Sequence, residues 1–200
     1  MAIQHHAPLI LASGSTIRQQ LLKAVGLTFS VEPSGTDEEA IAATIQHLSL
    51  PERALALARA KTVAVSRHHP QAYTIGADQI CAVEGEILNK PVTYDNACAQ
   101  LKKLAGRTHQ QHCGLVITHG SHVIWEHAAC ASLTMRPLSA EDIKAYVAAD
   151  SPLASCGSYK FESLGRHLFT DVEGDHDVIK GLPLVALLAR LHALKVISLT

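Results

Sequence analysis

Short apolar segments alternate with amphipathic ones along this chain, and this alternation limits the folds that it can adopt. Residues 9–12 and 73–83 predict buried strands, whereas residues 51–68 carry apolar side chains at helical spacing. Residues 84–88 turn the chain and extend the second strand as a hairpin. Helical crossovers favour parallel strands and hairpins favour antiparallel ones. The sequence therefore predicts an α/β fold with a mixed, twisted sheet flanked by helices.

The rest of the chain continues this alternation of strands and helices. A chain of 200 residues is long enough to bury one substantial core. It contains no internal repeat, linker or low-complexity tract, so we expect a single domain over residues 1–200. The other expected helices are 15–25, 94–104, 139–149 and 183–194, the other expected strands are 27–31, 108–118, 122–135 and 166–172, and 157–165 is an expected loop.

Composition excludes several functional classes. The net charge is −1, the pI is about 6.9 and only 4% of residues are aromatic, which argues against binding nucleic acid through charge or base stacking. No stretch reaches the ~20 apolar residues of a membrane span, and the first residues lack a signal-peptide pattern. The five cysteines contain no C-x-x-C pair and are interpreted as buried, reduced thiols. We expect a cytoplasmic protein with no nucleic-acid or membrane partner.

One carboxylate interrupts a predicted strand. Asp78 lies within the apolar segment 73–83, where an isolated charge is costly unless a cation, a divalent metal or a catalytic water compensates it. An aspartate at a strand end that faces solvent would need no such partner. The residues alone leave both interpretations open.

A second candidate lies where the first strand meets the first helix. Ser13, Ser15 and Arg18 follow the apolar run 9–12, so free backbone N–H groups and a guanidinium could bind an anion there. An ordinary serine-capped turn has the same pattern. Lys61, Lys90 and the acidic run 37–39, expected in a loop, would suit a polyphosphate site only in combination, and each alone is typical of a solvated surface.

Thirteen histidines stand out in a nearly neutral chain. His109 and His112 lie on the predicted strand 108–118, and no pair has the helical H-x-x-x-H spacing of a metal site. We interpret the histidines as surface residues.

Six separated motifs nevertheless occur together and in order. Residues 8–195 resemble the Maf family of nucleoside triphosphate pyrophosphatases through Leu-Ile-Leu-Ala-Ser-x-Ser-x-x-Arg at 9–18, Thr-Asp-Glu at 36–38, Ala-Lys at 60–61, Ile-Gly-Ala-Asp-Gln at 75–79, Asn-Lys-Pro at 89–91 and Gly-Leu-Pro at 181–183. The resemblance implies an elongated, two-lobed fold around a central cleft, related to inosine triphosphatases. It further implies hydrolysis of a nucleoside triphosphate between the α and β phosphates, a divalent metal such as Mg²⁺ or Mn²⁺, and a homodimer.

The resemblance also assigns roles by position. Asp78 matches the catalytic aspartate, and Glu38 matches an acidic residue that would hold the metal together with Asp78. The positions that match phosphate-binding residues are Ser13, Ser15, Arg18, Lys61 and Lys90.

Three positions match those that follow substrate preference in the family, namely Ile17, Gln79 and Glu162. With Gln79 and Glu162 at two of these positions, the chain resembles the subgroup that acts on 7-methyl-GTP. The chemistry agrees, because a carboxylate can accept hydrogen bonds from guanine N1–H and N2–H₂. Ile17 stands where that subgroup has Trp, Gln19 replaces a second basic residue, and Asn89 replaces a Gly. The alternatives are a dTTP/UTP pyrophosphatase of the same family and a non-catalytic nucleotide-binding regulator of septum formation.

Overall fold

The computed structural model describes residues 2–200, and in them one sheet has seven strands in the order β3-β2-β4-β6-β7-β8, with β5 paired to β4. A separate two-stranded sheet joins β1 to β9. The strands are β1 (Ile3–His5), β2 (Leu9–Leu11), β3 (Ser30–Val31), β4 (Tyr73–Val83), β5 (Glu86–Leu88), β6 (Thr108–His119), β7 (His122–Met135), β8 (Phe169–Glu173) and β9 (Ile197–Leu199). The helices are α1 (Thr16–Ala24), α2 (Glu38–Thr44), α3 (Leu50–Ser66), α4 (Tyr94–Leu104), α5 (Ala140–Asp150), α6 (His176–Ile179), α7 (Leu184–Ala193) and the 3-10 helix η1 (Leu164–Leu168).

The sheet is mixed, as predicted. Strand β2 runs parallel to β3 and β4, whereas β5 pairs antiparallel with β4, and β8 with β7. The β4–β5 hairpin turns at Glu84 and Gly85, whose φ angles of 50° and 83° suit a type I′ turn. The α/β class with helices flanking a mixed sheet is therefore confirmed.

The chain divides into two compact units. Unit 1 comprises the residues up to Asp78, then Cys113–Ala129 and Gly181–Thr200, and unit 2 comprises Gln79–His112 and Cys130–Lys180. Two units agree with the two-lobed expectation. The central cleft and the single domain over residues 1–200 stay predictions.

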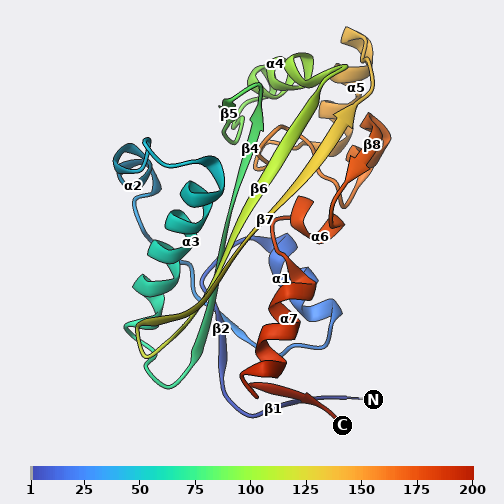
Figure 1. Cartoon of the computed structure of the whole chain (residues 1–200). Coiled ribbons are helices and arrows are strands. Elements are labelled where there is room, and N and C mark those ends of the chain that lie inside the picture. Colours follow the sequence, from blue (N-terminus) through green and yellow to red (C-terminus); the bar gives the residue numbers. More distant parts are fainter. Residues whose placement is uncertain (1) are drawn as a thin grey trace. The chain divides into compact units, whose positions relative to one another are not determined.

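Two apolar faces hold unit 1 together. Alternation along the first apolar run sends Leu9 and Leu11 to one face of the sheet and Ile10 and Ala12 to the other. The first face packs against leucines of α1 and α7, and the second packs against Val65 of α3. Figure 1 shows the same layers, with α3 on one side of β2 and β4 and with α1 and α7 on the opposite side.

Helix α2 corrects the prediction of an acidic loop at 37–39. Asp37 is its N-cap, where the carboxylate Oδ1 accepts from the backbone N–H of Ala40 at 3.0 Å. Glu38 and Glu39 form the first turn, where negative charge is favourable because the N-terminal end of a helix is positive. The acidic run is therefore a helix start.

The surface interpretation is wrong for His109 and His112, which are 1% and 6% exposed. In unit 2, His109 Nε2 lies 2.8 Å from the Tyr159 hydroxyl, to which Gln111 Nε2 donates at 2.7 Å. Burial lowers the pKa of His109 to about 4. Residues distant in sequence cover this side of β6, so its polar pattern did not signal burial.

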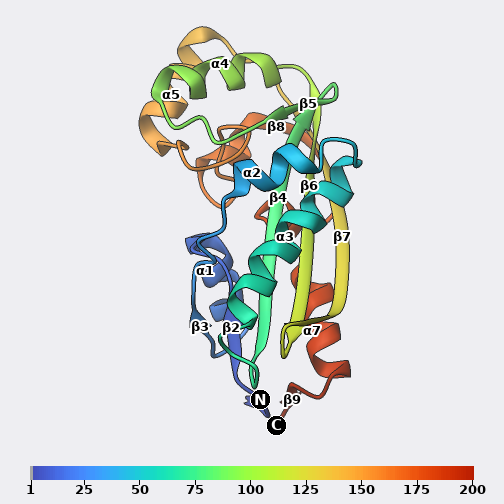
Figure 2. The ribbon, with the colours of Figure 1, turned by 90° about the vertical axis from the view of Figure 1, so that its left-hand side faces the viewer.

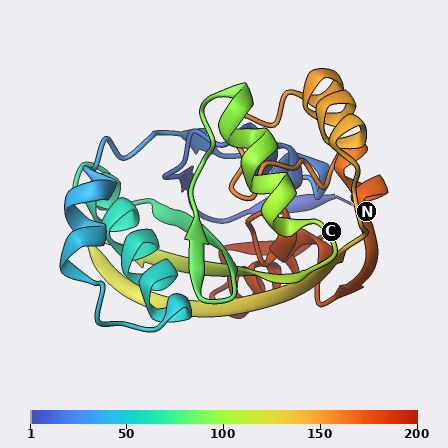
Figure 3. The same cartoon turned by 90° about the horizontal axis from the view of Figure 1, so that it is seen from above.

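Helices α4 and α5 of the same unit pack against each other (Figure 3).

Several short elements were not predicted from the sequence or were predicted with other bounds. Strands β1 and β9 and helix α6 were not expected, β3 has only two residues of the expected strand 27–31, and η1 replaces the first part of the expected strand 166–172. Each has five residues or fewer, too few for a periodic pattern. No helix within residues 2–200 is long and apolar enough to cross a membrane.

The cysteines are only partly as expected. Cys81 and Cys113 are buried, which agrees with the interpretation as small apolar side chains, but Cys130 is exposed. Cys130 lies in β7, where alternate residues face outward.

Candidate active site

Strand β4 presents Asp78 to helix α3. Ile75 and Ala77 point to the core face shared with α1 and α7, so the alternate residues Gly76 and Asp78 lie on the other face. There the Lys61 ammonium donates to Asp78 Oδ1 at 2.5 Å. Asp78 is 7% exposed and Lys61 is 8% exposed. The buried carboxylate thus has the cationic partner that one of the two interpretations of the sequence required.

Lys61 also contacts a second carboxylate. Its Nζ lies 2.8 Å from Glu38 Oε2, at the start of α2. The Glu38 side chain is 52% exposed, so this end of the cluster is open to solvent. One buried ammonium therefore joins two carboxylates, and solvent reaches the cluster from the Glu38 side.

The surroundings of Asp78 act on its proton affinity in opposite directions. Burial raises the pKa of Asp78 above its ordinary value, the charges of Lys61 and Arg18 oppose this, and Glu38 reinforces it. The net direction is upward. A carboxylate with a raised pKa is a better proton acceptor than an exposed aspartate.

The turn between β2 and α1 holds the predicted anion-binding residues together. Ser13 Oγ accepts from Ser15 N–H at 3.3 Å and from Arg18 Nη1 at 3.0 Å. Ser15 is the N-cap of α1, and its hydroxyl accepts from Arg18 N–H at 3.5 Å. The guanidinium is fixed further because Arg18 Nε donates to the Gly181 carbonyl at 2.8 Å.

That contact of Gly181 was not predicted. The motif at 181–183 was recognised in the sequence without a role, and it now has one, since its first carbonyl orients the Arg18 side chain. Motif order along a chain carries no information about which backbone oxygen meets which side chain.

The two carboxylates fit a divalent cation bound together with substrate. Glu38 and Asp78 already converge on one cationic atom, the Lys61 Nζ. No group of three or more His, Cys, Asp or Glu side chains within residues 2–200 could hold a metal alone. Mg²⁺ is commonly bound by one or two carboxylates plus substrate phosphates and water, which is the donor set that this cluster could supply.

The remaining predicted residues are split between the units. Ile17 is a half-buried residue of α1 in unit 1, whereas Gln79, Lys90 and Glu162 belong to unit 2. Lys90 and Glu162 are exposed, and Gln79 is half-buried. In unit 1 the structure thus forms two groups, one of Ser13, Ser15 and Arg18 and one of Glu38, Lys61 and Asp78, and the Arg18 charge opposes the rise in the pKa of Asp78.

Gln79 is held by helix α6. Its side-chain Nε2 donates to the carbonyl oxygens of Val178 at 3.0 Å and Ile179 at 2.8 Å. Both amide protons are used in this way, so within the described part of the chain the Oε1 oxygen is the atom left to accept a hydrogen bond.

Helix α4 holds the loop that carries Lys90. Gln100 Nε2 donates to the Asn89 carbonyl at 2.8 Å, and Asn96 Nδ2 donates to the Pro91 carbonyl at 3.0 Å. These residues line an open cavity of about 370 Å³ on unit 2. The backbone on either side of Lys90 is therefore held by α4, and the Lys90 side chain is exposed at this cavity.

Known proteins are similar to this chain over nearly all of its length. The model of the Maf family, described as Maf-like protein, matches residues 8–194. Proteins named nucleoside triphosphate pyrophosphatase are similar: one from Legionella pneumophila (strain Philadelphia 1) is 42% identical over 192 residues, and one from Nitrobacter winogradskyi is 43% identical over 194 residues. Each comparison covers 96% of both sequences.

Two solved structures also resemble the chain. They are a HAM1 protein from Coxiella burnetii, with a TM-score of 0.48 and 10% identity, and the Staphylococcus aureus Ham1 protein, with a TM-score of 0.49 and 14% identity. They cover 94% and 92% of this chain and 99% of their own. At these scores the fold class rests on the strand order alone, and the relation to inosine triphosphatases stays a prediction.

Proposed function

We propose that this chain, which belongs to the Maf family, is a hydrolase that cleaves a nucleoside triphosphate between the α and β phosphates and releases the nucleoside monophosphate and pyrophosphate. The observation that carries the proposal is the buried Asp78–Lys61 pair with Glu38 at its solvent-exposed end. Fold stability alone does not require a buried carboxylate with a buried lysine, since an apolar pair of similar volume is often at least as stable.

Asp78 would act as the general base. Its Oδ1 accepts from Lys61, so Oδ2 is the oxygen that can take a proton from the attacking water. The water oxygen then bonds to the α phosphorus, and the bond from that phosphorus to the α–β bridging oxygen breaks. The bridging oxygen leaves with its electron pair as part of pyrophosphate.

Fixed cations would stabilise the charge that develops on the leaving pyrophosphate. Arg18, held by Ser13 and Gly181, presents a guanidinium that suits a phosphate, and Ser15 caps a helix whose N-terminal end carries positive partial charge. Lys61 and Lys90 would add positive charge. A Mg²⁺ or Mn²⁺ ion held by Glu38 and Asp78 would add charge neutralisation on the phosphate oxygens when it is bound.

We further propose that the preferred substrate is 7-methyl-GTP. Gln79 offers the acceptor Oε1, because α6 takes both of its amide protons. The exposed Glu162 carboxylate could accept from guanine N1–H and N2–H₂, and its charge would favour the cationic methylated base. Ile17 has no aromatic face for stacking on a base, so selectivity would depend on the acceptors of Gln79 and Glu162.

A nucleotide panel tests these proposals. Purified protein with Mg²⁺ or Mn²⁺ is given 7-methyl-GTP, GTP, dTTP and UTP, and pyrophosphate release is measured. We expect pyrophosphate release to be fastest with 7-methyl-GTP, and we expect Asp78→Asn to abolish it. The control is Asp142→Asn, which alters a partly exposed capping carboxylate of α5 in unit 2 and should keep the activity. Equal activity of Asp78→Asn would remove the base from its role, and binding without turnover across the series would favour the non-catalytic regulator.

Glu162→Gln separates the two substrate assignments. We expect it to reduce kcat/KM for 7-methyl-GTP by about tenfold more than for UTP, because only the guanine edge has the paired donors. Equal losses on both substrates, or a wild-type preference for dTTP and UTP, would contradict the assignment to 7-methyl-GTP. A homodimer in the cytoplasm stays a prediction.

A further inference from the structure

Helix α3 packs closely against the parts of strands β4 and β6 that belong to unit 1. Figure 2 shows the helix running along these strands, and two glycines allow the approach. A Cβ on Gly76 would overlap Thr62 Oγ1 and would lie 3.0 Å from Thr62 Cβ and 3.2 Å from the Ala58 carbonyl oxygen. A Cβ on Gly114 would overlap the Ala54 carbonyl. At both points the space that a side chain would need is filled by the helix.

This close approach coincides with the candidate active site. Thr62 follows Lys61 directly in α3, and Asp78 follows Gly76 by two residues on the same face of β4. Both contacts, Gly76 with Thr62 and Asp78 with Lys61, therefore join β4 to α3 through two consecutive residues of the helix. Lys61 Nζ lies 2.5 Å from Asp78 Oδ1, and an outward movement of α3 by about 1 Å would carry this distance beyond the usual range of a hydrogen bond.

We infer that Gly76 is a positioning residue, whose missing side chain lets Thr62 seat α3 at the depth where Lys61 reaches Asp78. The inference rests on the proposed function in that Asp78 and Lys61 are taken as the reacting machinery. The φ angle of Gly76 is not positive, so its backbone conformation is open to other residues. Close packing is what excludes a side chain at this position.

The contact can be rebuilt from the helix side. Thr62 Oγ1 donates to the Ala58 carbonyl within α3, and Thr62 is fully buried. Removing this hydroxyl with Thr62→Ala vacates the position that a Cβ on Gly76 would occupy. The nearest atoms would then be Cβ of residue 62 at 3.0 Å and the Ala58 oxygen at 3.2 Å, distances that shifts of a few tenths of an ångström can relieve.

The test is a set of kinetic measurements on folded protein with 7-methyl-GTP or the best substrate of the panel. Gly76→Ala should lower kcat by about 10- to 100-fold with a smaller change in KM, because misplacing a catalytic group by about 1 Å has effects of this size. Thr62→Ala alone should stay within about threefold of wild type, and adding it to Gly76→Ala should restore most of the loss.

Two controls separate positioning from general destabilisation. In a Lys61→Met background, Gly76→Ala should cause no further loss of kcat, because the interaction that it disturbs is already gone. Gly114→Ala should also lower kcat, but Thr62→Ala should not restore it, since a Cβ on Gly114 meets Ala54 rather than Thr62. Additive losses in the Lys61→Met background, or no restoration of Gly76→Ala by Thr62→Ala, would overturn the inference.

A crystal structure gives a readout that does not depend on turnover. The distance from Lys61 Nζ to Asp78 Oδ1 should be longer in the Gly76→Ala crystal structure than in a wild-type crystal structure, and the double variant should return it to the wild-type value. Should Gly76→Ala not fold, Thr62→Val places a larger group against an intact Gly76 and should lengthen the same distance. An unchanged distance overturns the inference even in an inactive protein, whereas absence of turnover by the wild type overturns only the proposed function.

Discussion

Lowering the pH should weaken the fold through one buried histidine. His109 is 1% exposed and its pKa is lowered by burial to about 4, from an ordinary value of 6.5. Gln111 donates to the Tyr159 hydroxyl, so that hydroxyl can donate its single proton to His109 Nε2. The imidazole is thus buried in its neutral form, and protonation removes the acceptor as well as adding a buried charge.

The sign and size follow from proton linkage. Between pH 6.5 and about 4 the unfolded chain binds a proton at His109 that the folded chain does not, so stability falls as the pH drops through this window. The full stabilisation is present above pH 6.5. The difference of about 2.5 pKa units corresponds to about 3 kcal/mol in total, of which about 2 kcal/mol is lost between pH 7 and pH 5.

Urea unfolding at pH 7 and pH 5 measures this loss as a difference between proteins. His109→Gln removes the titrating ring, so its stability should fall by about 2 kcal/mol less than that of wild type over the same interval. The other titrating groups are common to both proteins and cancel. His68→Gln is the control, because His68 is exposed, and it should follow the wild type. Equal losses in wild type and His109→Gln would refute the reasoning.

Three further outcomes concern the active site. Lys61→Met should lower kcat by at least about 100-fold and destabilise the fold by about 3 kcal/mol in urea titrations, because it leaves Asp78 buried without its partner. Glu38→Gln should raise the Mg²⁺ concentration for half-maximal activity by about tenfold, whereas Glu39→Gln, its exposed neighbour, should not; equal requirements would exclude Glu38 as a ligand. Arg18→Lys keeps the charge but loses the fork held by Ser13, and steady-state kinetics should show kcat lowered about tenfold with a smaller change in KM, because Arg18 is proposed to act on the charge that develops as pyrophosphate leaves.

Local pattern predicted much of this structure because its central strands and its main helices are long. The strands at 73–83 and 122–135 and the helix at 94–104 have the predicted bounds, since each spans enough residues for a period to show. The requirement that Asp78 find a partner was also readable, because burial of a lone charge is costly in any fold. Which residue would supply the partner was not, since Lys61 lies 17 residues away on a different element.

The failures arise from contacts between distant segments. His109 was expected at the surface together with the other histidines, yet Tyr159, 50 residues later, contacts it in the buried interior. The anchor of Arg18 at Gly181 spans 163 residues. Strands β1 and β9 each have three residues, and only their mutual pairing makes them strands. A single sequence contains no signal for such pairings beyond the composition of each segment.

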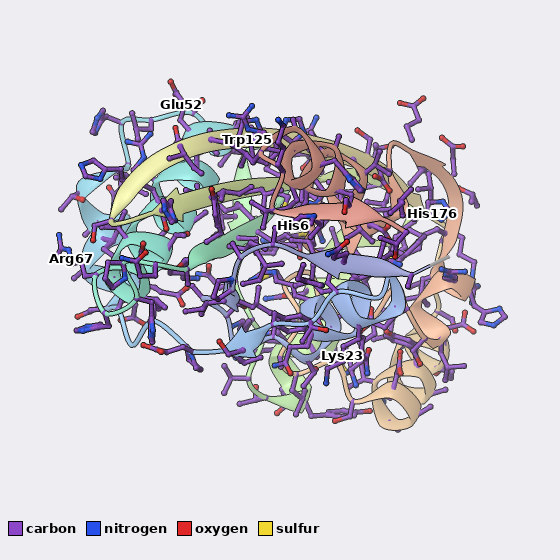
Figure 4. The ribbon with its side chains drawn as sticks, turned by 90° about the horizontal axis from the view of Figure 1, so that it is seen from below. His6, Lys23, Glu52, Arg67, Trp125 and His176 are labelled. Carbon is purple, nitrogen blue, oxygen red and sulfur yellow. The ribbon has the colours of Figure 1, made fainter. Side chains whose placement is uncertain are left out.

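The pairing of β1 with β9 joins the two ends of the described chain. Ala2 N–H donates to the Thr200 carbonyl at 2.8 Å, and Thr200 N–H donates to the Ala2 carbonyl at 3.0 Å. Figure 4 shows His6 at this sheet, where its Nε2 lies 2.8 Å from Ser198 Oγ. Fraying of one end therefore releases the other, so the ends open together rather than independently. A covalent link of a few residues between positions 2 and 200 would therefore hold β1 and β9 together.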